Sequence, residues 1–219
     1  MKLPWRSRVE TASIEEILPE PQGPSFKSYS SPGLEEALRG VADNGSCKVL
    51  DLGPLVADNV EFVSSFASYL QIVDAIDRSP SVHDTEGGGF GRLSTLQSLF
   101  NKHRRSFNLV LVWDVLNYLS TDQAERLIQA VAELCHPDAR LHAIIFATNT
   151  MAAVPNRYRI VDSARLTYEQ GTTELRGVPN LPPSAVEKLL KGFRIEHSYV
   201  LQHGVHEYVA ARKRWYVKK

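Results

Sequence analysis

CKVLDLGPLVADN, at residues 47–59, is the stretch of sequence that decides the fold of this chain. Its segment VLDL (49–52) surrounds Asp51 with apolar residues, which is typical of a buried strand. Gly53-Pro54 then marks a tight turn, and the residues after it begin a helix. In open α/β folds, ligands bind at the carboxyl end of such a strand, where the next helix points its free N–H groups. The stretch therefore predicts an α/β fold with a binding site at this turn.

The composition limits what kind of protein this is. The 219 residues, 43% of them hydrophobic, suffice for one substantial domain with a packed core. The 25 basic and 25 acidic residues cancel, which argues against a broad surface for nucleic acid. Cys47 and Cys135 lie far apart with no C-x-x-C pair, so neither a disulfide framework nor a zinc site is expected.

No segment of the sequence indicates a membrane or secreted protein. No apolar run approaches the roughly 18 residues that a membrane span needs. The N-terminal MKLPWRSRVE lacks the apolar core of a secretory signal. We therefore expect a cytoplasmic protein.

Alternating apolar segments predict a series of strands and helices joined by short connections. The expected strands are 48–52, 70–77, 107–113, 141–148, 193–201 and 206–212. The expected helices are 32–41, 59–68, 93–103, 122–134 with Thr121 as N-cap, and 184–190 with Ser184 as its cap. Such a series indicates a doubly wound, mostly parallel sheet that ends in an antiparallel hairpin. Residues 149–183 are expected to be irregular apart from a short strand at 164–168, and Pro137-Asp138 is expected to form a turn.

The two ends of the chain differ in composition from its middle. Residues 1–32 are rich in proline and are expected to form an arm, 33–212 the domain, and 213–219 a basic tail. The segment ARKRWYVKK at the end interleaves basic and aromatic residues. This pattern suits binding to a membrane surface, to RNA or to an acidic partner. The simpler interpretation is the end of a strand that is exposed to solvent.

VLDLG followed by a loop and a helix resembles motif I of the class I S-adenosylmethionine-dependent methyltransferases. The final hairpin extends this resemblance to about Pro32–Arg212. It implies a Rossmann-like sheet, S-adenosylmethionine as cofactor, and methyl transfer to an acceptor that the sequence does not identify. The chain departs from the family where G-x-G-x-G is usual. Here Pro54, Leu55, Val56 and Ala57 follow Gly53, so Pro54 removes an N–H donor and Leu55 adds bulk.

The resemblance assigns cofactor contacts to several residues. Asp51 corresponds to the strand acid that orders the amino-acid end of the cofactor, and Gly53 to the first glycine of the motif. Alternatively, Asp51 is tied to nearby backbone N–H groups and Gly53 serves the turn alone. The acid that binds the ribose hydroxyls is expected to be Asp77, within DRSP, with Asp74 as its competitor.

The segment WDVLNYLS, residues 113–120, resembles motif IV and the residues just after that motif. The family places these residues beside the reactive methyl group, so Asp114, Asn117 and Tyr118 are the catalytic candidates. Asp114 is suited to accept a proton or orient a substrate amine, or else to cap the next turn. Trp113 is expected either to stack on the cofactor or to fill the core.

Other patterns are weaker. The glycine run at 87–91 lacks the tight strand and helix of a phosphate loop, so a flexible loop is expected. His203, His206 and Glu207 fall in a turn where such residues usually face solvent, and no metal is expected.

Three functions are consistent with these patterns. The first is methyl transfer from S-adenosylmethionine. The alternative is a non-catalytic methyltransferase-like scaffold or partner subunit, because motif glycines are missing and both termini suit docking to a protein partner. A Rossmann-type oxidoreductase is a weaker third, because G-x-G-x-x-G is absent.

Overall fold

The computed structural model describes residues 26–41, 46–76, 96, 98–99 and 103–213. Its strands are β1 (Phe26–Ser30), β2 (Cys47–Asp51), β3 (Ala67–Ile72), β4 (Phe107–Trp113), β5 (Cys135–Phe146), β6 (Thr150–Ala152), β7 (Arg157–Asp162), β8 (Arg165–Glu169), β9 (Leu175–Gly177), β10 (Phe193–Val200) and β11 (Val205–Arg212). Its helices are α1 (Pro32–Leu38), α2 (Ala57–Ser64), α4 (Thr121–Leu134) and α5 (Pro183–Leu189), with 3₁₀ turns η3 (Val115–Tyr118) and η4 (Gln202–Gly204).

A six-stranded mixed sheet forms the centre of the protein. Its strand order is β10-β11-β5-β4-β2-β3. Strands β3, β2, β4 and β5 pair in parallel, and β11 and β10 are added antiparallel to β5. The predicted doubly wound sheet with a C-terminal hairpin is therefore confirmed.

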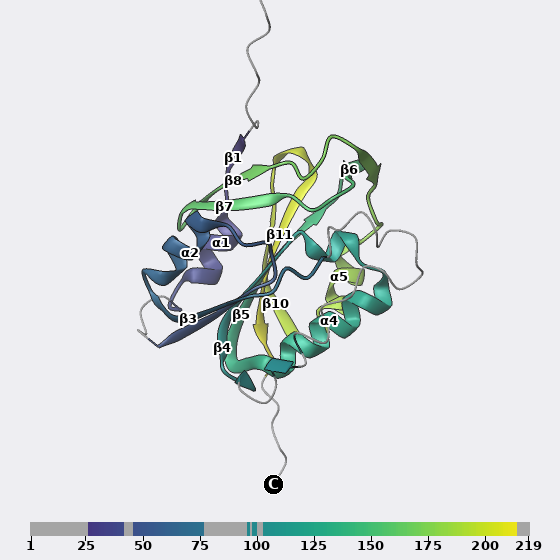
Figure 1. The fold of residues 1–219 in the computed structure, drawn as a ribbon. Coiled ribbons are helices and arrows are strands. Elements are labelled where there is room, and N and C mark those ends of the chain that lie inside the picture. The colour runs from purple at the N-terminus through teal and green to yellow at the C-terminus, as the bar shows by residue number, and fades with distance from the viewer. Residues whose placement is uncertain (1–25, 42–45, 77–95, 97, 100–102, 214–219) are drawn as a thin grey trace, which may run out of the picture.

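Each central strand is buried on both faces, and successive residues pack into different cores. Val49 and Leu109 face a core shared with α1, α2 and the strands β7 and β8. Leu50 and Val110 face the opposite core, which α4 and α5 cover. Figure 1 shows α1 and α2 on one side of the sheet and α4 and α5 on the other.

The residues between β5 and α5 are more regular than expected. They contain β6, β7, β8 and β9, whereas the sequence predicted one short strand in an irregular segment. β7 and β8 form a second sheet with β1, in the order β1-β8-β7, and β6 pairs with β9. The strand β1 lies within the stretch assigned to the N-terminal arm, and the domain boundaries themselves stay predictions.

Several predicted boundaries were wrong. Pro137-Asp138 is not a turn but part of β5, because Phe107 pairs with Cys135 and Leu109 with Arg140, so the extra residues form a bulge. α2 ends at Ser64, not at residue 68. β3 begins at Ala67, three residues early, because Ala67 already pairs with Cys47.

Two predicted helix caps were also wrong. Thr121 is the first residue of α4, and Ser120 caps it. The Ser120 hydroxyl accepts a bond from the Gln123 N–H (3.3 Å), and the Gln123 side chain accepts one from the Ser120 N–H (2.9 Å). Ser184 lies inside α5, which begins at Pro183, a residue whose fixed φ suits the first helical position.

Some predictions fall outside the described residues. These are the glycine run at 87–91, most of the helix at 93–103 and the tail from residue 214. Among the helices that the structure describes, none is long and apolar enough to cross a membrane.

A buried carboxylate fastens α1 to the sheet. Glu207 on β11 has no exposed surface. Its oxygens accept bonds from the Ser31 hydroxyl (2.5 Å) and the Gly33 N–H (2.8 Å), and His142 Nε2 lies 3.5 Å away. A β-carbon at Gly33 would stand 2.7 Å from the Glu207 β-carbon, so only glycine allows this approach. Burial alone would raise the pKa of Glu207, but His142, Ser31 and Gly33 together lower it below its ordinary value.

We expect Glu207→Ala to reduce the free energy of unfolding by about 3–5 kcal/mol, because it leaves buried donors and His142 without their acceptor. Urea unfolding at pH 7 measures the change. Glu196→Ala is the control, because Glu196 forms an exposed pair with Arg194 (2.6 Å) that contributes less than about 1 kcal/mol. Equal effects of the two substitutions would contradict the assigned role of Glu207.

Candidate functional site

The carboxyl ends of β2, β3 and β4 meet at one edge of the main sheet, which is where ligands bind in this class of fold. Asp51 ends β2 and Trp113 ends β4. Beyond β3, the Val73 N–H donates to the Asp51 carbonyl (2.7 Å) and the Ala75 N–H to the Leu52 carbonyl (3.0 Å). These bonds bring Asp74 alongside Asp51, so three of the residues singled out in the sequence lie at this edge.

Asp51 is bonded entirely within the protein. Its side chain is 2% exposed, and one carboxylate oxygen accepts from the Gly53 N–H (2.8 Å) and from the Trp113 indole N–H (2.6 Å). Burial raises the pKa of Asp51 to about 6, and the charge of Asp74 adds to that rise while the two hydrogen bonds oppose it. These contacts match the interpretation that Asp51 shapes the loop, and its role toward a cofactor stays a prediction.

The Trp113 indole fills the space above the turn. A β-carbon at Gly53 would stand 2.7 Å from the indole Cδ1 and 2.9 Å from its Nε1, so the glycine makes room for this ring. The indole also stacks on Tyr158, with ring centroids 5.4 Å apart and planes inclined by 5°. Trp113 adopts φ of 54°, a left-handed conformation that costs energy for a bulky residue. The core position that the sequence allowed for Trp113 is thus the observed one.

A small hollow lies at this edge. The described residues enclose a cavity of about 10 Å³, lined by Leu52, Gly53, Pro54, Asp74, Ile76, Trp113, Asp114, Val115, Pro155 and Asn156. Leu55 is not among them, because its side chain is 72% exposed. The side chain that packs against Gly53 therefore comes from the end of β4 and not from Leu55 of the altered glycine loop.

The three catalytic candidates are occupied by structural contacts. Asp114 Oδ2 accepts bonds from the Asn156 N–H (3.1 Å) and the Tyr158 hydroxyl (3.4 Å). The Asn117 amide donates to the carbonyls of Asp114 (2.8 Å) and Ile144 (2.9 Å).

The Asn117 side-chain oxygen accepts from the Phe146 N–H at 2.9 Å. The Tyr118 hydroxyl reaches the carbonyls of Ala152 (3.1 Å) and Val154 (3.2 Å). Catalytic roles for Asp114, Asn117 and Tyr118 stay predictions.

Two other sets of residues singled out in the sequence are Asp77 and the possible metal ligands His203, His206 and Glu207. Asp77 lies outside the described residues. Glu207 turns into the core, away from the exposed His203. Among the residues that the structure describes, no group of three or more His, Cys, Asp or Glu is placed to hold a metal ion.

Sequence reasoning missed the residues that close the edge from above. Tyr158 and Asn156 come from the segment expected to be irregular. Asn59 on α2 holds this segment in place, because its side chain donates to the Tyr158 carbonyl (3.0 Å) and accepts from the Ile160 N–H (2.8 Å). The signal was present: in RYRIVD (157–162), Tyr158 and Ile160 alternate with arginines, the period of a half-buried strand.

Comparison with models of protein families and with curated protein sequences gives no match. Solved structures do match. An S-adenosylmethionine-dependent methyltransferase from Mesorhizobium loti is 16% identical, over 83% of this chain and 96% of that one, with a TM-score of 0.51. One from Clostridium acetobutylicum is 12% identical over 83% and 92%, with a TM-score of 0.48.

A third is 1,6-didemethyltoxoflavin-N1-methyltransferase from Burkholderia thailandensis, solved with 1,6-didemethyltoxoflavin and S-adenosylhomocysteine bound. It is 15% identical over 84% of this chain and 77% of that one, with a TM-score of 0.46. Of these three, the Mesorhizobium loti protein alone exceeds 0.5, and at such identity the likeness shows the fold. The chain has the fold of the class I S-adenosylmethionine-dependent methyltransferases.

We expect the stability of the protein to depend on pH through Asp51. Its folded-state pKa of about 6 lies above the ordinary value of 3.8, so its contribution is present below pH 3.8 and lost as pH rises through 6. Asp51→Asn removes this titration. The unfolding free energy of the variant, relative to the native chain, should therefore rise by roughly 2–3 kcal/mol between about pH 4 and pH 7. Urea unfolding across this range measures it, and a difference that stays constant would refute the assignment.

Proposed function

We propose that this chain is a non-catalytic methyltransferase-fold module, a scaffold or partner subunit that acts through contacts with other proteins. The observation that carries this proposal is the position of the Trp113 indole, which lies against Gly53 and is bonded to Asp51. The ring lies at the carboxyl edge of the sheet, the edge where ligands bind in this class of fold.

The hollow that the described residues line at the strand edge is smaller than a cofactor pocket. Pockets for small molecules measure about 300–1,000 Å³, whereas the described side chains leave about 10 Å³ between Gly53, Trp113 and Asn156. This hollow alone therefore does not accommodate S-adenosylmethionine.

Opening the edge would also cost energy, because the indole must leave both Asp51 and the stacked ring of Tyr158. Asp51 would then be a buried carboxylate with one donor fewer, at a cost of about 1–3 kcal/mol. Loss of the stacked ring pair adds roughly 0.5–1.5 kcal/mol. Any ligand at this edge would have to supply that energy before it gained affinity.

A second candidate function is methyl transfer from S-adenosylmethionine to an unidentified acceptor. It is favoured by the fold and by the acids Asp51 and Asp74, which stand at the ends of neighbouring strands. In this function the acid on the ribose is Asp77 or Asp74, and Asp114, Asn117 and Tyr118 flank the acceptor. It requires that Trp113 leave the position described above.

Calorimetric titration of the full chain with S-adenosylmethionine and S-adenosylhomocysteine separates the two functions. For the module we expect no saturable heat at ligand concentrations up to about 1 mM. Saturable one-to-one binding in the micromolar range would overturn the module and establish the second candidate. In that case Asp77→Ala should weaken binding far more than Asp74→Ala, and the reverse order would refute the ribose assignment.

We expect Trp113→Gly to be the variant that opens the edge. Glycine tolerates the left-handed backbone at this position, and loss of the indole clears the space above Gly53. The substitution should lower stability by about 3–5 kcal/mol, so thermal unfolding must first show that the variant is folded. Trp113→Phe, which keeps an aromatic ring but not the N–H, is the matched control and should stay closed. Equal ligand responses from the native chain and both variants would show that Trp113 does not govern access.

A further inference from the structure

Two hollows lie at the end of the main sheet opposite the strand edge, and both are lined by Arg212 and Lys213 at the end of β11. One measures about 650 Å³ and is lined by Pro137, Asp138, Arg140, Arg194, Glu196, Ala211, Arg212 and Lys213. The other, called the basic groove here, measures about 630 Å³ and is lined by Arg104, Arg105, Glu125, Gln129, Ala132, Glu133, Leu189, Lys191, Gly192, Arg212 and Lys213.

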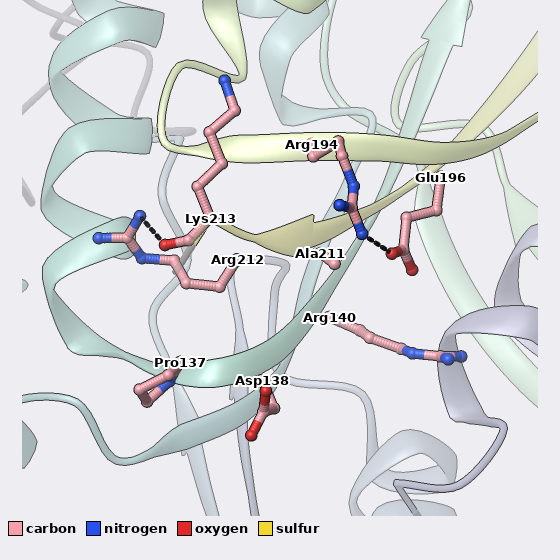
Figure 2. Close-up of a pocket in the computed structure, with 8 residues that line it drawn as sticks. All are labelled: Pro137, Asp138, Arg140, Arg194, Glu196, Ala211, Arg212 and Lys213. Carbon is pink, nitrogen blue, oxygen red and sulfur yellow. Dashed lines mark hydrogen bonds and ion pairs between the residues drawn. The ribbon is translucent and has the colours of Figure 1, made fainter. Parts of the chain in front are cut away.

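Two arginines of the first hollow are already neutralised within the protein. Figure 2 shows Arg194 joined to Glu196 on β10, at 2.6 Å, with Arg140 turned away from that pair. Arg140 Nη1 lies 3.3 Å from a carboxylate oxygen of Glu36 on α1 and also binds the Glu36 carbonyl. The cations of this hollow that form no ion pair among the described residues, Arg212 and Lys213, also line the second hollow.

The basic groove is different. Arg104, Arg105, Lys191 and Lys213 are all exposed, and the described part of the chain places no ion-pair partner on any of their side chains. The groove's own acids are Glu125 and Glu133, both exposed on α4. Five cations thus line a groove with two carboxylates, in a chain whose total charge is zero.

Arg212 lines the groove, and hydrogen bonds to two backbone carbonyls hold its guanidinium in place. Its Nε donates to the Ala132 carbonyl (2.8 Å) and its Nη1 to the Gly192 carbonyl (2.6 Å). The guanidinium therefore sits at the last turn of α4, where the helix dipole favours a cation, and ties that turn to the start of β10. Lys191 directly precedes Gly192, and Lys213 directly follows Arg212. Both lysines therefore extend from backbone that these hydrogen bonds hold in place.

We propose that the basic groove binds an acidic segment of another protein, one that carries glutamates or aspartates. The exposed cations of the groove supply charge complementarity. Glu125 and Glu133 can accept hydrogen bonds from the backbone N–H groups of a peptide, donors that a phosphate backbone lacks, which favours protein over nucleic acid. The basic tail predicted from the sequence begins at Lys213, and this setting favours the acidic partner among the three considered for it.

The chain itself supplies a suitable probe sequence. Residues 10–20, ETASIEEILPE, contain four glutamates, no cation and several apolar residues. A labelled synthetic peptide of this sequence, titrated with the full chain in dilute solution, reports binding by fluorescence anisotropy. The control peptide has every glutamate replaced by glutamine.

We expect the glutamate peptide to bind at least about tenfold more tightly than the glutamine peptide, and more weakly as salt rises from about 50 to 300 mM. Lys191→Glu combined with Lys213→Glu should weaken binding about tenfold or more. The matched control is Lys27→Glu with Arg157→Glu, which makes the same charge change at exposed positions of β1 and β7 and should leave binding unchanged.

Three results would overturn the proposal. One is equal affinity for the two peptides, and another is equal weakening by both double variants. The third is tighter binding of a single-stranded oligonucleotide of the same net charge at the same salt concentration, which would make nucleic acid the ligand. Because the groove lies far from the strand edge, none of these results depends on whether the edge binds a cofactor.

Discussion

The hydrogen bond from the Trp113 indole to the Asp51 carboxylate is the contact on which the carboxyl edge of the sheet depends. It joins the ends of β2 and β4, two central parallel strands. It also fixes the ring on which Tyr158 stacks, and so seats the second sheet on the first. Gly53 is required because the ring lies so close to it. A motif glycine that suggests ligand binding in the sequence is thus explained by packing within the chain.

The terminal hairpin is held by charged residues on both faces of β11. Glu207 and Arg212 lie on opposite faces of this strand, because side chains alternate along it. Glu207 accepts bonds from the start of α1, and Arg212 donates to the end of α4. One strand thereby connects the helical layers on the two sides of the sheet. Charged groups serve here because each meets unpaired backbone or hydroxyl groups that an apolar side chain would leave unsatisfied.

The fold could be read from the sequence where burial alone decides structure. Phe107–Trp113 was predicted to the residue because it is almost wholly apolar, and α4 to within one residue because its apolar face is regular. The site could be read only in part. The edge position of Asp51 was predicted, but its donor Trp113 lies 62 residues away. The left-handed φ of Trp113 has no local signal, and the strands between 149 and 183 carry a weak alternation that a motif search overlooks.

The packing at the carboxyl edge of the sheet and the distribution of charge on the surface both support the proposed function. The tryptophan at the end of β4 packs against the carboxyl edge of the sheet, and in the proposed function surfaces elsewhere on the protein carry the specificity. Zero net charge conceals such a surface, because Arg140 and Arg194 of the first hollow form ion pairs, whereas the described residues give Arg104, Arg105, Lys191 and Lys213 of the basic groove no ion-pair partner. Lys191 and Lys213 flank the backbone that the Arg212 hydrogen bonds fix in place, an arrangement that would lower the entropy lost on binding the proposed partner. The proposed recognition surface therefore lies at the end of the sheet opposite the edge where this class of fold binds its cofactor.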